Sequence, residues 1–179
     1  FLDIDGTLLP FGKGVPESAA KAIEKASSEG HRFFLSTGRS TAEIDSRLKI
    51  LPLKGGVFSA GGTVVYDGKT IFQRVFSREE KDFILDYARN NNLVVLLQSG
   101  DGTYLTKEAG DIFVSLLMKY LGRVIDIPNF KIVDTFPEDL ELYKLLFFSL
   151  EGKVAQVRKE LEGRLVVVDN TVGLPYEIM

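Results

Sequence analysis

Two aspartates lie two residues apart near the start of the chain, in the stretch FLDIDGTLLPF. The apolar residues around them predict the end of a buried strand, Phe1–Ile4, and side chains two apart on an extended chain point to the same side. Asp3 and Asp5 would therefore face one space and repel each other unless a cation or a proton lies between them. A hard divalent ion such as Mg²⁺ takes oxygen ligands and keeps substrate phosphate in its shell, so the pair suits chemistry on a phosphate ester.

The two carboxylates could divide that chemistry between them. One can attack phosphorus and form an aspartyl-phosphate, which splits one difficult displacement into two easier ones. The other, when protonated, can give its proton to the leaving alcohol and later take one from the attacking water. Gly6 allows an immediate turn and the Thr7 hydroxyl can hold it. A solvated Asp-Gly turn is the alternative for D-G-T alone, and the longer string FLDIDGTLL disfavours it.

A second polar motif, T-G-R at residues 37–39, follows the next predicted strand, residues 31–36. Thr37 and Gly38 would lie beside the aspartates if the two strands are parallel. A hydroxyl, a glycine amide and the start of the next helix, predicted for Thr41–Leu48, all favour a bound phosphate. An ordinary strand-to-helix turn is the alternative for this motif alone. Arg39 could pair with substrate or with a neighbouring acid, and the sequence leaves both open.

Strands and helices are predicted to alternate in residues 1–77, so that each of the two motifs follows the end of a strand. A helix is predicted for Val15–Gly30, because a proline stands near its start, small and apolar residues form one stripe, and Gly30 ends it. Strand, helix, strand and helix at this spacing predict a parallel sheet with right-handed crossovers. The segment GGVFSAGGTVVYDGKTIFQRVF predicts a further strand and a hairpin that turns at Asp67-Gly68.

Helices alternate with hairpins in residues 78–179, which predicts an α+β unit built on an antiparallel sheet. Predicted helices cover residues 78–92, 108–122 and 153–163, and predicted strands lie in residues 93–106, 141–151 and 164–179. The segment Gly100-Asp101-Gly102 is predicted to form a hairpin turn. Asp169-Asn170 is likewise predicted to form a turn.

Composition narrows the function classes. The 179 residues carry a net charge of −3 and no cysteine, which excludes disulfides and thiolate metal sites and disfavours nucleic acid or an anionic membrane as a partner. No apolar run approaches the ~20 residues of a membrane span and no secretory signal leads the sequence, which favours a cytoplasmic location. Oligomeric state is not predicted.

The motifs D-x-D-G-T at residues 3–7 and T-G-R at residues 37–39 resemble those of Cof-type phosphatases in the haloacid dehalogenase (HAD) superfamily. The resemblance implies that Asp3 is the nucleophile and Asp5 the acid/base. It implies a Mg²⁺ ion held by the Asp3 carboxylate and the Asp5 backbone carbonyl. Phosphoryl oxygens would be held by the main chain around Ile4 and by Thr37 and Gly38.

The resemblance also implies a fold. It predicts an α/β protein whose Rossmann-like core, with a parallel sheet, is represented in part by residues 1–77. An inserted α+β cap of type IIB (C2B) would occupy residues 78–179. Ala60-Gly61 stands where this subgroup usually has Asn-Gly. The family's lysine and its G-D-x-x-N-D metal loop are absent from this sequence, so we expect a fragment that lacks the second half of its core and is a poor catalyst alone.

The favoured function is a Mg²⁺-dependent phosphatase acting on a small phosphorylated metabolite, with a sugar phosphate preferred. A phosphomutase of the same superfamily is one alternative. A non-catalytic module that binds phosphorylated ligands is another. A receiver-like regulatory domain is disfavoured, because its phosphorylated aspartate follows a later strand and no cap is inserted.

Overall fold

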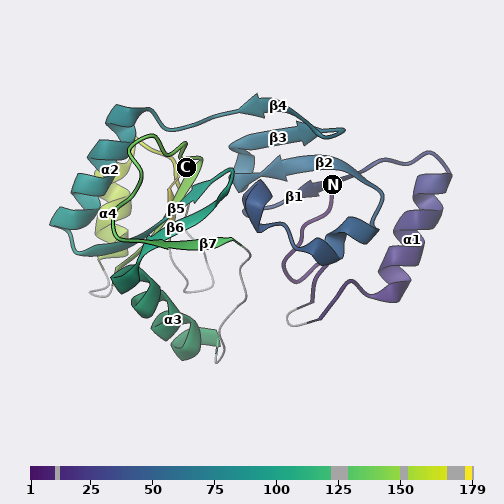
Figure 1. Ribbon diagram of the computed structural model, residues 1–179, viewed down its shortest axis with the longest axis horizontal. Coiled ribbons are helices and arrows are strands. Elements are labelled where there is room, and N and C mark those ends of the chain that lie inside the picture. Colours follow the sequence, from purple (N-terminus) through teal and green to yellow (C-terminus); the bar gives the residue numbers. More distant parts are fainter. Residues whose placement is uncertain (11–12, 122–128, 150–152, 169–175, 179) are drawn as a thin grey trace. The chain divides into compact units, whose positions relative to one another are not determined.

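The computed structural model describes residues 1–10, 13–121, 129–149, 153–168 and 176–178. The chain divides into two compact units, Phe1–Arg74 and Val75–Met179 (Figure 1). The division follows Arg74, slightly before the predicted boundary between residues 77 and 78. Each unit has its own sheet, so the mixed α/β class predicted from the sequence is confirmed.

The sheet of the first unit contains four strands in the order β1-β2-β3-β4. These are β1 (Phe33–Ser36), β2 (Leu53–Phe58), β3 (Thr63–Tyr66) and β4 (Lys69–Gln73). The pair β1–β2 is parallel, and the pairs β2–β3 and β3–β4 are antiparallel. The predicted hairpin turn between β3 and β4 is confirmed, since Asp67 and Gly68 both have the positive φ that such a tight turn requires.

The predicted strand Phe1–Ile4 is reduced to one parallel bridge, between Leu2 and Leu35. The reason is local, because Ile4 already belongs to the following turn. Its carbonyl accepts hydrogen bonds from the backbone amides of Thr7 and Leu9, at 3.3 Å and 2.9 Å. The ladder therefore contains Leu2 alone, but its parallel direction agrees with the prediction.

Helix α1 (Glu17–Ser28) lies within the predicted range Val15–Gly30. Pro16 precedes its first residue, as is common where a backbone donor is not needed. The apolar side chain of Ile23 packs into a buried cluster with residues from the sheet and the loops, namely Ile4, Leu8, Leu9, Leu35, Leu48, Leu51 and Phe58. This cluster forms the core of the first unit.

The predicted helix Thr41–Leu48 is wrong. Two short 3-10 helices replace it, η1 (Thr41–Glu43) and η2 (Ser46–Ile50). Between them Asp45 has an extended backbone, and its side chain accepts a hydrogen bond from the Arg47 amide at 2.8 Å. Short polar side chains that bond to the nearby backbone compete with helix formation, which explains the break.

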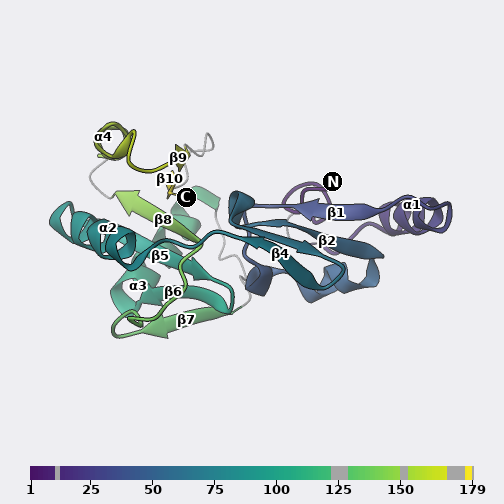
Figure 2. The same cartoon turned by 90° about the horizontal axis from the view of Figure 1, so that it is seen from above.

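In the described residues of the second unit, the strands form a six-stranded sheet in the order β7-β6-β5-β8-β10-β9, whose strands are labelled in Figure 2. Its strands are β5 (Leu93–Ser99), β6 (Gly102–Thr106), β7 (Phe130–Val133), β8 (Lys144–Ser149), β9 (Val167–Val168) and β10 (Tyr176–Ile178). The sequence interpretation missed β7, which pairs in parallel with β6. The sheet is therefore mixed, although its other pairs are antiparallel as predicted.

Helices cover both faces of this second sheet. Helices α2 (Arg78–Asn90) and α4 (Val154–Leu161) pack with Val95 and Leu97 of β5 in one buried cluster. Leu96 points to the opposite face and packs with residues of α3 (Lys107–Leu121). The alternation along β5 follows from the two-residue period of a strand.

Gly100 and Asp101 form the turn between β5 and β6 and Gly102 begins β6, so the predicted hairpin is confirmed. Asp101 accepts hydrogen bonds from Lys131 at 2.5 Å and from the Tyr104 hydroxyl at 2.9 Å. Lys131 lowers the pKa of Asp101, so a structural ion pair accounts for this acidic residue. Asp169-Asn170 lies outside the described residues.

Within the described ranges, the structure contains no helix with the length and apolar character needed to cross a membrane.

Candidate active site

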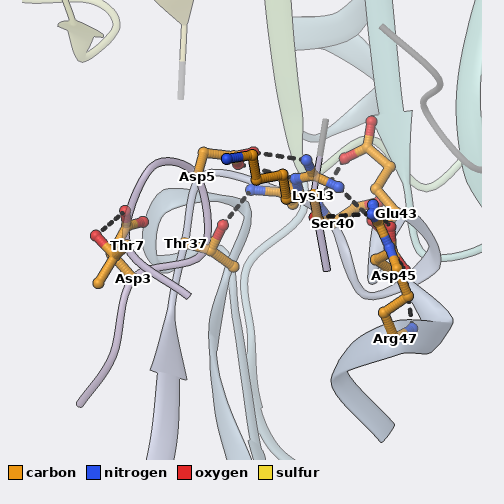
Figure 3. A network of polar contacts seen from close by, with 10 residues as sticks. Asp3, Asp5, Thr7, Lys13, Thr37, Ser40, Glu43, Asp45 and Arg47 are labelled. Carbon is orange, nitrogen blue, oxygen red and sulfur yellow. Dashed lines mark hydrogen bonds and ion pairs between the residues drawn. The ribbon is translucent and has the colours of Figure 1, made fainter. Parts of the chain in front are cut away.

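In the first unit, the segment around Leu2 runs parallel to β1, and each of the two is followed by a loop at its carboxyl end. The Leu2 amide donates to the Phe34 carbonyl and the Ser36 amide donates to the Leu2 carbonyl, each at 2.8 Å. Asp3 and Thr37 therefore begin neighbouring loops on the same edge (Figure 3). Open α/β sheets bind ligands at this edge.

The first loop is a tight turn anchored in the core through Ile4, whose side chain is fully buried. Asp3 and Asp5 stand on either side of Ile4 in the sequence, and both are exposed. Gly6 follows with φ 81°, a conformation that favours glycine, and lets the chain reverse at once. The Thr7 hydroxyl donates to Asp3 Oδ2 at 3.2 Å, so it holds the turn as the sequence analysis expected.

The second loop begins at Thr37, whose side chain is buried. Its Oγ accepts a hydrogen bond from the Arg39 amide at 3.1 Å. The hydroxyl hydrogen is thereby still available for donation to an anion. Gly38 is exposed beside it. The expected helix start does not contribute, since η1 has only three residues.

Arg39 joins the two loops. Its Nε donates to Asp5 Oδ2 at 2.9 Å and its Nη2 donates to Asp5 Oδ1 at 2.6 Å. Of the two pairings that the sequence left open, this structure contains the one with a neighbouring acid. The hydrogen bond to Asp5 raises the pKa of the Arg39 guanidinium above its ordinary value, against partial burial that lowers it.

Glu43 supports this loop and was missed by the sequence analysis. Its side chain is buried, and Oε2 accepts a hydrogen bond from the Ser40 amide at 2.7 Å. Its backbone carbonyl accepts from Arg39 Nη1 at 3.2 Å. The signal was present in the stretch S-T-A-E, because a serine followed three residues later by glutamate is the pattern of a capping box.

A strained segment follows β2 on the same edge. Ser59 and Ala60 have φ values of 50° and 53°, which cost energy for residues with a Cβ. The segment is held because the Ser59 amide donates to the Arg39 carbonyl at 2.8 Å and the Ala60 amide donates to the Thr37 carbonyl at 3.2 Å. Ala60 has a left-handed conformation that asparagine tolerates better, and it stands at the position where the sequence analysis noted Ala-Gly in place of the Asn-Gly usual in the resembled subgroup.

The donor set at this edge fits a hard divalent cation. The Asp3 carboxylate and the Asp5 backbone carbonyl would supply oxygen ligands, the kind that Mg²⁺ prefers. Nowhere in the described part of the chain do three acidic or histidine side chains gather as a complete metal site. A partial protein shell is what Mg²⁺ commonly uses, since it retains water and takes substrate phosphate as a further ligand.

A second aspartate–arginine pair lies in the same unit and has a pH dependence that can be tested. Arg47 Nε and Nη2 donate to the two carboxylate oxygens of Asp45 at 2.9 Å and 2.5 Å. These side-chain hydrogen bonds lower the pKa of Asp45 from 3.8 to about 2, against burial that raises it. Because the folded-state pKa is lowered, the pair stabilises fully above pH 3.8, and this stabilisation is lost as the pH falls through about 2.

We expect Arg47→Gln to return the pKa of Asp45 toward 3.8. An NMR titration of the Asp45 carboxyl carbon measures this directly. An unchanged midpoint in the variant would show that Arg47 does not cause the shift.

Both the sequence and the fold are similar to those of known proteins. Residues 1–177 match the haloacid dehalogenase-like hydrolase family. The chain is 26% identical to YkrA of Bacillus subtilis (strain 168) over 149 residues, covering 83% of this chain and 56% of YkrA. It is 26% identical to phosphatase YwpJ of the same organism, covering 62% of this chain and 40% of YwpJ. The chain thus spans about half the length of these relatives.

Solved structures share the fold. A haloacid dehalogenase-like hydrolase from B. subtilis superimposes with a TM-score of 0.80 at 19% identity, covering 99% of this chain and 71% of that chain. The HAD subclass IIB sugar phosphatase BT4131 superimposes with a TM-score of 0.73 at 18% identity, covering 99% and 67%. The chain therefore belongs to the haloacid dehalogenase-like hydrolases and has the fold of their Cof-type members.

Proposed function

We propose that the full-length protein carrying this sequence is a Mg²⁺-dependent phosphatase with Asp3 as nucleophile and Asp5 as general acid and base. The observation that carries this proposal is the parallel pairing of Leu2 with Leu35, because it brings the Asp3 and Thr37 loops to one edge. The family match over residues 1–177 supports the reaction class, and the names of the relatives as phosphatases support hydrolysis.

The residues have separate tasks in this mechanism. An Asp3 carboxylate oxygen attacks phosphorus, and the bond from phosphorus to the ester oxygen breaks as Asp5 gives that oxygen a proton. Water then attacks the aspartyl-phosphate, Asp5 takes the proton from that water, and phosphate leaves. Mg²⁺ held by the Asp3 carboxylate and the Asp5 carbonyl would neutralise charge on the phosphoryl group. The main chain around Ile4, with Thr37 and Gly38, would hold phosphoryl oxygens.

Thr37→Ala should weaken phosphate binding by about 1–3 kcal/mol, because a hydrogen bond to a charged group is lost. The inhibition constant for inorganic phosphate measures this effect. Thr37→Ser retains the hydroxyl and serves as the matched control. Equal phosphate inhibition of the alanine and serine variants would contradict a role for the hydroxyl.

Turnover of para-nitrophenyl phosphate by the full-length protein tests the function itself. We expect release of inorganic phosphate with Mg²⁺, loss of activity with EDTA, and recovery when Mg²⁺ is restored. Isomerised ester without released phosphate would favour a phosphomutase. Binding of phosphate esters without turnover would identify a non-catalytic module.

A sugar phosphate is the proposed substrate class, and the second unit is the proposed type IIB cap. The fold shared with the sugar phosphatase BT4131 supports both proposals. A panel of hexose phosphates, glycerol phosphates and nucleotides would rank the classes by kcat/KM. Higher kcat/KM for nucleotides than for hexose phosphates would overturn the preference. The cytoplasmic location predicted from the sequence stays a prediction.

A further inference from the structure

Arg39 contacts both halves of the proposed catalytic machinery. Its guanidinium forms two parallel hydrogen bonds with the Asp5 carboxylate, and its backbone amide donates to Thr37 Oγ. The Arg39 side chain is 18% exposed and that of Asp5 is 43% exposed. The contact therefore joins a largely enclosed cation to a carboxylate that faces the solvent side of the turn.

Arg39 is itself fixed from several directions. Nη1 donates to the Glu43 carbonyl at 3.2 Å, so all three guanidinium nitrogens have acceptors. Its carbonyl accepts from the Ser59 amide at 2.8 Å. Ser40, the next residue, donates its amide to the buried Glu43 carboxylate at 2.7 Å. The guanidinium is thus presented as a rigid planar fork rather than as a mobile surface charge.

We propose that Arg39 is a positioning residue that orients the Asp5 carboxylate for proton transfer to and from the reacting oxygen. An exposed aspartate can rotate about its side-chain bonds, whereas a bidentate guanidinium fixes both the position and the plane of the carboxylate. Proton transfer needs a carboxyl oxygen that lies within hydrogen-bond distance of the reacting oxygen and points toward it. A fixed orientation of Asp5 should therefore raise the rate of the proton-transfer step. The inference rests on the proposed function and deepens it.

Arg39 supplies no proton in this scheme. An arginine guanidinium stays protonated in proteins, and the Arg39 side chain donates hydrogen bonds to both Asp5 carboxylate oxygens. Its effect must therefore pass through Asp5. Loss of Arg39 should impair esters whose leaving group needs a proton and spare esters whose leaving group departs as a stable anion. A direct contact of Arg39 with the phosphoryl group would instead affect both kinds of ester equally.

The test compares an alkyl phosphate with para-nitrophenyl phosphate in the full-length protein, using kcat/KM because it reports formation of the aspartyl-phosphate. We expect Arg39→Gln to lower kcat/KM for the alkyl ester about 10- to 100-fold and for the nitrophenyl ester less than about threefold. Arg39→Lys should behave like the glutamine variant, since a lysine lacks the planar fork. Arg47→Gln removes another bidentate pair of the same unit and should leave both values unchanged.

A double-mutant cycle gives a second readout. Arg39→Gln should cost nothing further in an Asp5→Asn background if Arg39 acts only through Asp5. Equal losses for the two esters, or additive losses in the cycle, would overturn the inference while leaving the phosphatase proposal intact. A wild-type protein that hydrolyses neither ester would overturn the proposed function and, with it, this inference.

Discussion

We expect the Asp3→Asn protein to lose phosphatase activity by at least about a thousandfold, because an amide cannot take the place of the attacking carboxylate. The fold should survive, since the Asp3 side chain is exposed and accepts only a long hydrogen bond, at 3.2 Å, from the Thr7 hydroxyl among the described residues. Initial rates with para-nitrophenyl phosphate, together with the midpoint of thermal unfolding, measure the two parts of this prediction.

Asp67→Asn is the matched control for Asp3→Asn. Asp67 occupies the β3–β4 turn with φ 48°, a conformation that asparagine accepts, and it has no part in the proposed chemistry. Its activity should equal that of the wild type. Retained turnover by Asp3→Asn, in protein shown by mass spectrometry to be free of deamidation, would refute the covalent mechanism. A beryllium fluoride adduct located on a side chain other than Asp3 would refute it equally.

The Asp5→Asn protein should be slowed by about 10²–10⁴-fold toward an alkyl phosphate, the usual contribution of a positioned acid or base. The loss should be smaller for formation of the aspartyl-phosphate from para-nitrophenyl phosphate, because that leaving group needs no proton. Hydrolysis of the intermediate should still be slow, since Asp5 no longer takes the proton from water. Rapid-quench measurements should therefore detect an accumulated phosphoenzyme with this ester.

Stability distinguishes this effect from simple unfolding. The Asp5–Arg39 contact is partly exposed, and such ion pairs contribute about 0–1 kcal/mol, so Asp5→Asn should remain folded. Asp45→Asn removes the carboxylate of the other bidentate pair and should keep full activity. A phosphoenzyme that forms and breaks down at wild-type rates in Asp5→Asn would exclude Asp5 as acid and base.

The parts of the candidate site that depend on residues close together in the sequence could be predicted. The spacing of Asp3 and Asp5, the turn at Gly6 and the hydroxyl of Thr7 all act within one short loop. Thr37 was placed correctly relative to them because parallel strands bring their carboxyl ends to one edge. The roles assigned to these residues remain predictions until the variants are measured.

The predictions that failed involved local hydrogen bonds and one strand pairing that the pattern of residue types does not reveal. The helix expected for Thr41–Leu48 broke because Asp45 bonds to the Arg47 amide, an alternative that apolar periodicity does not reveal. The strand expected for Phe1–Ile4 shortened because the turn begins at Ile4. β7, which pairs in parallel with β6, was missed altogether.

The sequence by itself determined the tight turn that presents two carboxylates and the alternation of elements that makes an α/β protein, and it led to the proposed reaction class. These features depend on residue type and short spacing, which are visible in a linear string. Only the tertiary structure decided that the Arg39 guanidinium forms two hydrogen bonds with the Asp5 carboxylate. It also decided that the buried Glu43 carboxylate accepts the hydrogen bond from the Ser40 amide that stabilises the loop of Arg39. Arg39 and Asp5 are 34 residues apart, so their contact requires the sheet register and both loop conformations to be established first.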